Sequence, residues 1–134
     1  MESFLKFATF GIAIEVVFTA VVDNFERYKA GHKINWSMTG HSYIWMLPIY
    51  DSIAFIAPLV IVPLQGLFIL FRLFLFALMI LFVEYVTGWI LLKFTGRCPW
   101  HYSSGLHVHH LIRIDYIPFW MFFAWMVEWL YFNY

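Results

Sequence analysis

Four long apolar stretches take up most of this 134-residue sequence and leave few choices of fold. A helix that crosses a bilayer needs about 20 mostly apolar residues. That template fits the chain at four places, residues 4–22, 43–62, 65–94 and 117–134. A soluble domain contains about 25% charged residues, whereas this chain contains 12%. We therefore expect an all-α, polytopic membrane protein whose four transmembrane helices form one integral membrane domain over residues 1–134.

The connections between these stretches differ in length, and the difference predicts two helical hairpins. Pro63, Leu64 and Gln65 join the second and third stretches in a tight turn, whereas residues 23–42 and 95–116 form long polar loops. With four spans, both long loops lie on the same face of the membrane. They carry most of the Lys and Arg residues, which are enriched in cytoplasmic loops. The sequence thus predicts a multi-pass protein of the lipid bilayer with cytoplasmic long loops.

The second and third stretches are not expected to be simple straight spans. Pro58 lies inside the second stretch, which ends near Pro63. Proline removes a backbone hydrogen bond and clashes with the preceding turn, so a kink is predicted. The third stretch would be about 45 Å long at 1.5 Å per residue, which exceeds the hydrocarbon core of about 30 Å. It must tilt or project beyond the membrane.

Each apolar stretch contains one internal acidic residue, and the four are Glu15, Asp51, Glu84 and Glu128. A carboxylate at the middle of a spanning helix costs about 2.5–3.5 kcal/mol on insertion scales, so such a group is protonated, paired or turned toward a polar interior. Counting inward from the long-loop side at 1.5 Å per residue places Glu15, Asp51 and Glu84 in one layer, with Glu128 deeper. This intramembrane polar layer is the first candidate site.

The partners of these acids are less strongly constrained by the sequence. Tryptophan N–H groups, tyrosine hydroxyls and loop amides are expected first, with Arg97 and Arg113 as the basic candidates from the loops. Arg72 is expected to extend to the opposite interface, as long basic side chains do. Two interpretations stay open: the acids fix helix register through hydrogen bonds, or Glu15, Asp51 and Glu84 bind an ion, a proton, a lipid headgroup or a small solute.

All six histidines lie in the two long loops. His107, His109 and His110 have a spacing that could ligate zinc, copper or the metal of a haem-type or chlorophyll-type pigment. The alternative is an interfacial loop whose histidines bond water and phosphate headgroups. Cys98 is the only cysteine, so an internal disulfide is excluded. The cofactor is unknown, and the sequence requires none.

No motif indicates catalysis or nucleic-acid binding. The net charge is zero, so no basic excess favours nucleic acid, and no nucleophile set, phosphate loop or nucleotide motif is present. Four short spans bury little surface, although the chain carries 16 Phe, 8 Tyr and 7 Trp. We expect a non-catalytic accessory or scaffold subunit of a larger membrane complex, with other membrane subunits as partners. The alternative is a component that binds or transports a solute, an ion or a lipid.

A weak internal repeat agrees with the two hairpins. Residues 15–17, Glu-Val-Val, resemble residues 84–86, Glu-Tyr-Val, and each set is followed by a polar loop with a tryptophan, Trp36 or Trp100. Chance similarity between aromatic-rich membrane segments is the alternative.

Four segments also carry a resemblance to a known family. They are residues 15–20 (EVVFTA), 40–50 (GHSYIWMLPIY), 84–91 (EYVTGWIL) and 98–103 (CPWHYS). In order and spacing they resemble the transmembrane protein 229 family and the related bacterial group of putative ABC-transporter type IV, or CmpB-like, membrane proteins. The resemblance implies a compact helical membrane domain. It also implies motif positions at Glu15, Glu84 and Glu128 and in the loop motif Trp100, His101, Tyr102 and Ser103.

The chain departs from this family pattern at three positions. The family shows an acidic residue where this chain has His101, and glycine where it has Asp51 and His110. Asp51 therefore adds an acid to the interior that the resemblance does not imply. Any ATP-driven role would require separate subunits, because this chain contains no nucleotide-binding segment.

Overall fold

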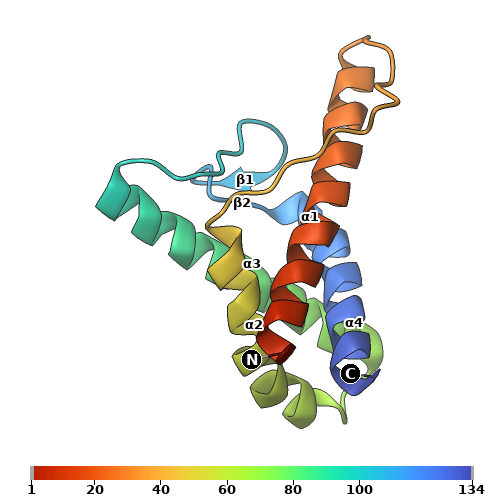
Figure 1. Cartoon of the computed structure of the whole chain (residues 1–134), viewed down its shortest axis with the longest axis vertical. Coiled ribbons are helices and arrows are strands. Elements are labelled where there is room, and N and C mark those ends of the chain that lie inside the picture. Colours follow the sequence, from red (N-terminus) through yellow and green to blue (C-terminus); the bar gives the residue numbers. More distant parts are fainter. Residues whose placement is uncertain (1, 134) are drawn as a thin grey trace. The chain divides into compact units, whose positions relative to one another are not determined.

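A computed structural model describes residues 2–133 of the chain, apart from the side chains of residues 2–4 and 54. Residues 1 and 134, which end the predicted domain and the predicted fourth span, lie outside the described residues. This part of the chain is mostly helical (Figure 1), and its elements in order are α1 Glu2–Lys29, α2 Met46–Leu64, α3 Ile69–Thr95, β1 His107–Val108, β2 Ile112–Arg113, a 3-10 turn Ile114–Tyr116 and α4 Ile117–Asn133. The predominantly helical structure confirms the all-α class.

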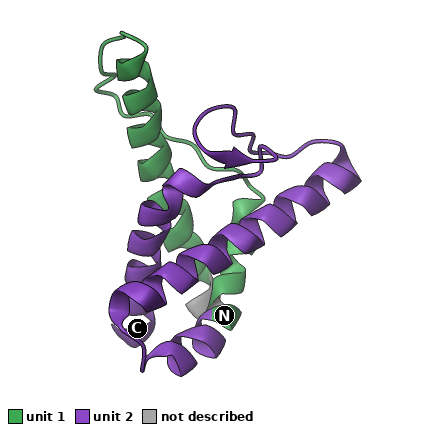
Figure 2. Ribbon diagram, turned by 180° about the vertical axis from the view of Figure 1, so that it is seen from behind, with its two compact units in different colours: residues 1–56 green, residues 57–134 purple. Residues whose placement is uncertain are grey.

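The chain divides into two compact units, residues 1–56 and residues 57–134 (Figure 2). The first unit holds α1 and the first half of α2. The second holds the rest of α2, α3, the hairpin and α4. The boundary lies inside α2.

Within residues 2–133, two helices are long and apolar enough to cross a membrane, Leu5–Lys29 in α1 and all of α3. A third crossing is added if Met46–Ile53 and Phe55–Leu64 form one bent span. Two or three candidate spans are compatible with an integral membrane protein. The 17 residues of α4 measure about 25 Å at 1.5 Å per residue, so α4 is shorter than the hydrocarbon core of about 30 Å.

The first helix continues well past the predicted end of its span at residue 22. It runs to Lys29 through a polar segment that contains Asp23, Glu26 and Arg27. The length of the apolar stretch limits how much of a helix lies in the membrane. It does not limit the helix itself, because the backbone hydrogen bonds also form in water. The helix ends beside Gly31, whose φ of 81° is a conformation that glycine adopts at little cost.

The second helix is bent, as its prolines predicted. The axes of Met46–Ile53 and Phe55–Leu64 differ by 42°. A proline ring clashes with the carbonyl four residues earlier, and for Pro58 this carbonyl belongs to residue 54, where the two segments meet. The bend therefore lies where Pro58 disrupts the helix.

The turn between α2 and α3 is longer than expected, so α3 begins at Ile69 rather than Gln65. Backbone hydrogen bonds from Gln65 to Val62 and from Leu67 to Leu64 close two successive turns here. A helix needs uninterrupted bonds between residues four apart, and these three-residue turns delay the start of α3. The apolar pattern marks the stretch but not its first helical residue.

The core of the second unit is the contact between α3 and α4. Both helices bury residues three or four apart, which is the spacing of one helical face. On α3 these are Leu73, Phe76, Ala77, Leu81, Glu84 and Gly88, and on α4 they are Trp120, Phe123, Ala124, Val127 and Glu128. Two of the four acids of the apolar stretches, Glu84 and Glu128, thus lie on buried faces of this helix pair.

The segment between α3 and α4, predicted as a long polar loop, contains a short β-hairpin. β1 and β2 form an antiparallel hairpin that pairs His107 with Arg113 and Val108 with Ile112. We call residues 98–116 the cap. Its contacts with α3 build the site described next.

Candidate functional site

Glu84 is buried on α3, and the loop motif supplies its partner. The hydroxyl of Tyr102 donates a hydrogen bond to Oε1 of Glu84 at 2.7 Å. The hairpin holds Tyr102 in place through two contacts with His110. The backbone N–H of Tyr102 donates to the carbonyl of His110 at 3.0 Å, and Nδ1 of His110 lies 2.7 Å from the carbonyl oxygen of Tyr102. The expectation that a tyrosine hydroxyl binds an intramembrane acid is confirmed here.

Trp100 attaches the cap to the same face of α3. Its side chain is buried, and its indole N–H donates to the carbonyl of Leu111 at 3.1 Å. Gly88 provides the space on α3, because a Cβ there would lie 3.2 Å from Leu111 and 3.3 Å from the indole. The absent side chain of Gly88, one turn after Glu84, thus admits the indole.

Arg113 organises the polar side of the cap. Its buried guanidinium donates from Nε to Oδ1 of Asp115 at 3.1 Å and from Nη1 to the hydroxyl of Tyr116 at 2.7 Å. The rings of Tyr116 and Tyr102 meet edge to face at 5.9 Å. Arg113, which the sequence offered as a partner for the intramembrane acids, thus has Asp115 as a bidentate partner.

The guanidinium of Arg113 also holds the pKa of Asp115 below its usual range, through their hydrogen bonds. This pair stabilises the cap fully above the ordinary pKa of an aspartate. The contribution is lost as the pH falls through the lowered pKa of the folded state.

In the same cap, burial raises the pKa of the Cys98 thiol, so the thiol is neutral at physiological pH.

Glu128 forms a buried ion pair with Arg72. Nε of Arg72 donates to Oε2 of Glu128 at 3.1 Å, Nη2 donates to Oε1, and Nη1 donates to the carbonyl of Gln65 at 3.1 Å. Both side chains are 11% exposed. The sequence did not predict this pairing, and the expectation that Arg72 extends to its own interface stays a prediction. Arg72 lies near the start of α3 and Glu128 near the end of α4, where the two helices are in contact. Because the surroundings are apolar, each charge is stabilised by its oppositely charged partner.

Glu15 has hydroxyl partners within the first unit. The Ser42 hydroxyl donates to Oε2 of Glu15 at 2.7 Å, and the Tyr50 side chain also bonds this carboxyl group. Gly11 lies one turn earlier on α1, and a Cβ there would collide with the ring of Tyr50. Glu15 therefore links α1 to the following segment and to the start of α2.

The segment that carries Ser42 lies along α1 because two α1 side chains bind its backbone. Thr19 Oγ1 bonds both the N–H and the carbonyl of His41, at 2.9 Å each. Asn24 accepts the N–H of Asn35 at 2.7 Å. Gly40 permits this approach, because a Cβ at Gly40 would collide with the carbonyl of Val16.

Asp51 differs from the other three acids. It is half-buried on α2 and forms no hydrogen bond or ion pair with any other residue that the structure describes. Glu15 and Asp51 belong to the first unit, and Glu84 and Glu128 belong to the second. The single layer of Glu15, Asp51 and Glu84 stays a prediction.

The rings of three cap histidines contact one another, with His101 stacked on His110 and His107 tilted against it. The ring centroids of His107 and His110 are 4.3 Å apart, and those of His101 and His110 are 4.6 Å apart. Nδ1 of His109 lies 2.8 Å from the hydroxyl of Tyr85. Within residues 2–133, no group of three or more His, Cys, Asp or Glu side chains is placed to hold a metal ion.

His109 and His110 also form the turn of the hairpin. Their φ angles are 50° and 61°, and the N–H of Leu111 donates to the carbonyl of Val108 at 3.0 Å across them. Positive φ at both central residues is the geometry of a type I′ turn, which usually contains Asn and Gly. The sequence contains no turn motif of that kind, so the hairpin was not predicted. Ser103, the last residue of the loop motif, is exposed.

The three buried acids accept hydrogen bonds from other side chains. Glu15 and Glu84 accept them from hydroxyl groups, and Glu128 accepts them from a guanidinium. No family model matches this sequence, and no solved structure matches it either.

Replacing Tyr102 by Phe is expected to lower the free energy of unfolding by about 1–3 kcal/mol, because the Glu84 carboxyl group loses a hydrogen bond in a buried place. Thermal unfolding in detergent, followed by circular dichroism, measures the change. Tyr28→Phe is the matched control, because Tyr28 is 64% exposed and its variant should stay within about 0.5 kcal/mol. Equal stability of the two variants would contradict a structural role for the Tyr102 hydroxyl.

Proposed function

We propose that this chain is a non-catalytic integral membrane protein that serves as an accessory or scaffold subunit of a larger membrane complex. The observation that carries the proposal is that Glu15, Glu84 and Glu128 each bond a partner within their own unit. Acids used in this way hold loops and helices in register. They are not directed at a substrate.

The proposed topology has four crossings, with α2 as one bent span and α4 as the last. At about 25 Å, α4 spans a bilayer that is locally thinned, which costs only fractions of a kcal/mol per Å of mismatch. Both long connections then lie on one face, which is cytoplasmic because they hold most of the basic residues.

The need for partner subunits is supported by the surface of the helices. In the most apolar segment of each helix, only 22% of α1 and 28% of α3 is buried. Lipid covers apolar side chains, but it offers no acceptor for an indole N–H. Trp125 stands at the middle of α4 and is 46% exposed, far from the interfaces where tryptophan is usually enriched. A neighbouring membrane helix with an exposed carbonyl or hydroxyl would satisfy this group.

The test is to purify the tagged chain in mild detergent and identify the membrane proteins that accompany it. For a scaffold, Glu84→Gln should reduce the amount of folded chain and the recovery of its partners together, because the variant weakens the contact between α3 and the cap. A Glu84→Gln protein that folds normally, retains its partners and loses only the binding or transport of a solute would overturn the proposal.

A second candidate function is the binding or transport of an ion, a small solute or a lipid through Glu15, Asp51 and Glu84. Asp51 favours it, because a half-buried carboxyl group on a candidate membrane helix has no partner among the described residues. Asp51→Asn then serves as the discriminating variant. It should leave folding and partner recovery unchanged for a scaffold, and it should abolish ligand binding or transport for a transport component.

A further inference from the structure

The C-terminal end of α3 carries basic side chains that form no ion pair with an acidic side chain that the structure describes. No Asp or Glu occurs between Glu84 and Asp115 in the sequence. Glu84 itself is buried against Tyr102, and Asp115 is paired with Arg113. Lys93 and Arg97 are exposed, so their charges are not compensated within this stretch.

The length of α3 places these two residues at the level of the lipid headgroups. Counted from Ile69 at 1.5 Å per residue, Trp89 lies about 30 Å along the axis and Lys93 about 36 Å. The hydrocarbon core is about 30 Å thick. A span that begins at one edge of this core therefore reaches the other edge near Trp89, and Lys93 and Arg97 follow just outside it.

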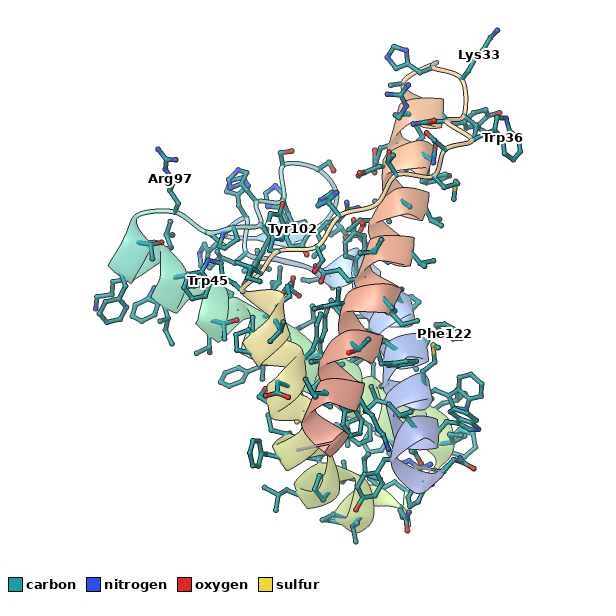
Figure 3. All side chains as sticks on the ribbon, viewed as in Figure 1. Lys33, Trp36, Trp45, Arg97, Tyr102 and Phe122 are labelled. Carbon is teal, nitrogen blue, oxygen red and sulfur yellow. The ribbon has the colours of Figure 1, made fainter. Side chains whose placement is uncertain are left out.

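The local structure holds the Lys93 ammonium and the backbone of Arg97 in defined positions. The Lys93 ammonium lies 5.0 Å from the centre of the Trp89 ring, and an ammonium carries three N–H donors, more than one ring face engages. Gly96 ends the helix with a φ of 73°, and its N–H bonds the carbonyl of Leu92. The Thr95 hydroxyl donates to the carbonyl of Arg97 at 2.7 Å, and the side chain of Arg97 extends away from the ribbon (Figure 3).

We propose that Lys93 and Arg97 bind the phosphate of an anionic phospholipid headgroup, with Trp89 and the 81% exposed Phe94 at the boundary of its acyl chains. The choline of a zwitterionic headgroup would repel the same cations, so a headgroup with net negative charge is preferred. The attraction of basic residues to a helix C-terminus explains why these side chains occur here, but both side chains stay exposed and can still bind an anion. The inference requires only that α3 crosses a membrane, and it is independent of the accessory role.

The end of α1 provides an internal comparison. Arg27 and Lys29 lie in its last turn, but Asp23 and Glu26 stand beside them in the sequence. The mixed charge there predicts a weaker preference for anionic lipid. The two helix ends therefore supply matched variants.

The experiment is native mass spectrometry of the whole chain released from detergent that contains equal amounts of phosphatidylglycerol and phosphatidylcholine. The wild-type chain should retain phosphatidylglycerol preferentially. The double variant K93Q/R97Q should bind it about 25-fold more weakly, since each basic residue near an anionic surface contributes about fivefold. The control R27Q/K29Q should change this affinity less than K93Q/R97Q does. All four residues are exposed, so both variants should fold as the wild type does.

Equal retention of the two lipids by the wild-type chain would overturn the proposal, as would an unchanged affinity in K93Q/R97Q. Inorganic phosphate is the competitor that separates a lipid site from a site for a free anion. Phosphate at millimolar concentration should displace little phosphatidylglycerol, and full displacement would overturn the assignment to a lipid.

Discussion

Replacing Arg72 by Gln is expected to lower the free energy of unfolding by about 3–5 kcal/mol, because Glu128 is then left without its guanidinium in a buried place. Both side chains of the pair are 11% exposed, so water cannot replace the lost partner at either one. The variant also loses the hydrogen bond to the carbonyl of Gln65, which ties the turn before α3 to the helix pair. Thermal unfolding in detergent, followed by circular dichroism, measures the loss.

A double variant distinguishes the cost of leaving one charge unpaired from the cost of changing the shape of the two side chains. Arg72→Met combined with Glu128→Leu removes both charges together, and replacing a buried ion pair by apolar residues is often neutral or stabilising. The double variant should therefore recover most of the stability that Arg72→Gln loses. Arg27→Gln is the exposed control, with an expected change within about 0.5 kcal/mol. A change of that size in Arg72→Gln would show that the pair does not hold α3 to α4.

The Arg72 and Glu128 pair also shows what the sequence could not provide. The apolar pattern predicts the stretches that become α1 to α4, because burial in lipid requires apolar length. It does not say which turn of α3 lies beside which turn of α4. Arg72 lies near the start of α3 and Glu128 near the end of α4, and these two ends meet only when the helices pack side by side. Counting depth for each helix separately missed the contact.

The hydroxyl partners were predictable in kind but not in identity. Glu15 receives Ser42 and Glu84 receives Tyr102, and each hydroxyl comes from the connection that follows the acid. The internal repeat stays a prediction. The choice of serine in one unit and tyrosine in the other depends on the path of each connection, which Gly40 and Gly88 permit by lacking a side chain.

The hairpin was missed for a conformational reason. A type I′ turn favours Gly and Asn because both central residues have positive φ, whereas this turn contains His109 and His110. In this turn the His109 ring contacts the hydroxyl of Tyr85, and the His110 ring contacts the ring of His107. The family resemblance implied glycine at position 110, and a φ of 61° is a conformation that glycine adopts readily. A departure from a glycine pattern was thus the available signal for the turn.

Replacing Trp100 by Ala is expected to lower the free energy of unfolding by about 3–5 kcal/mol, the usual cost of removing a large buried aromatic side chain. The indole fills the space above Gly88 and bonds the carbonyl of Leu111, so the variant loses contact area and leaves a buried carbonyl without its donor. Chemical unfolding in detergent gives the magnitude. Trp36→Ala is the control, because Trp36 is 84% exposed, and it should change little.

Trp100→Phe tests whether the hydrogen bond or the ring holds the cap on α3. Phe retains most of the apolar contact but has no N–H, so a loss of about 1–3 kcal/mol is expected from the unsatisfied carbonyl. If the cap is a structural cover for Glu84, Trp100→Ala and Tyr102→Phe should be less than additive, because residues that share one contact network couple. Full additivity, or a Trp100→Ala protein as stable as Trp36→Ala, would mean that the cap and α3 unfold independently and that Glu84 needs no cover.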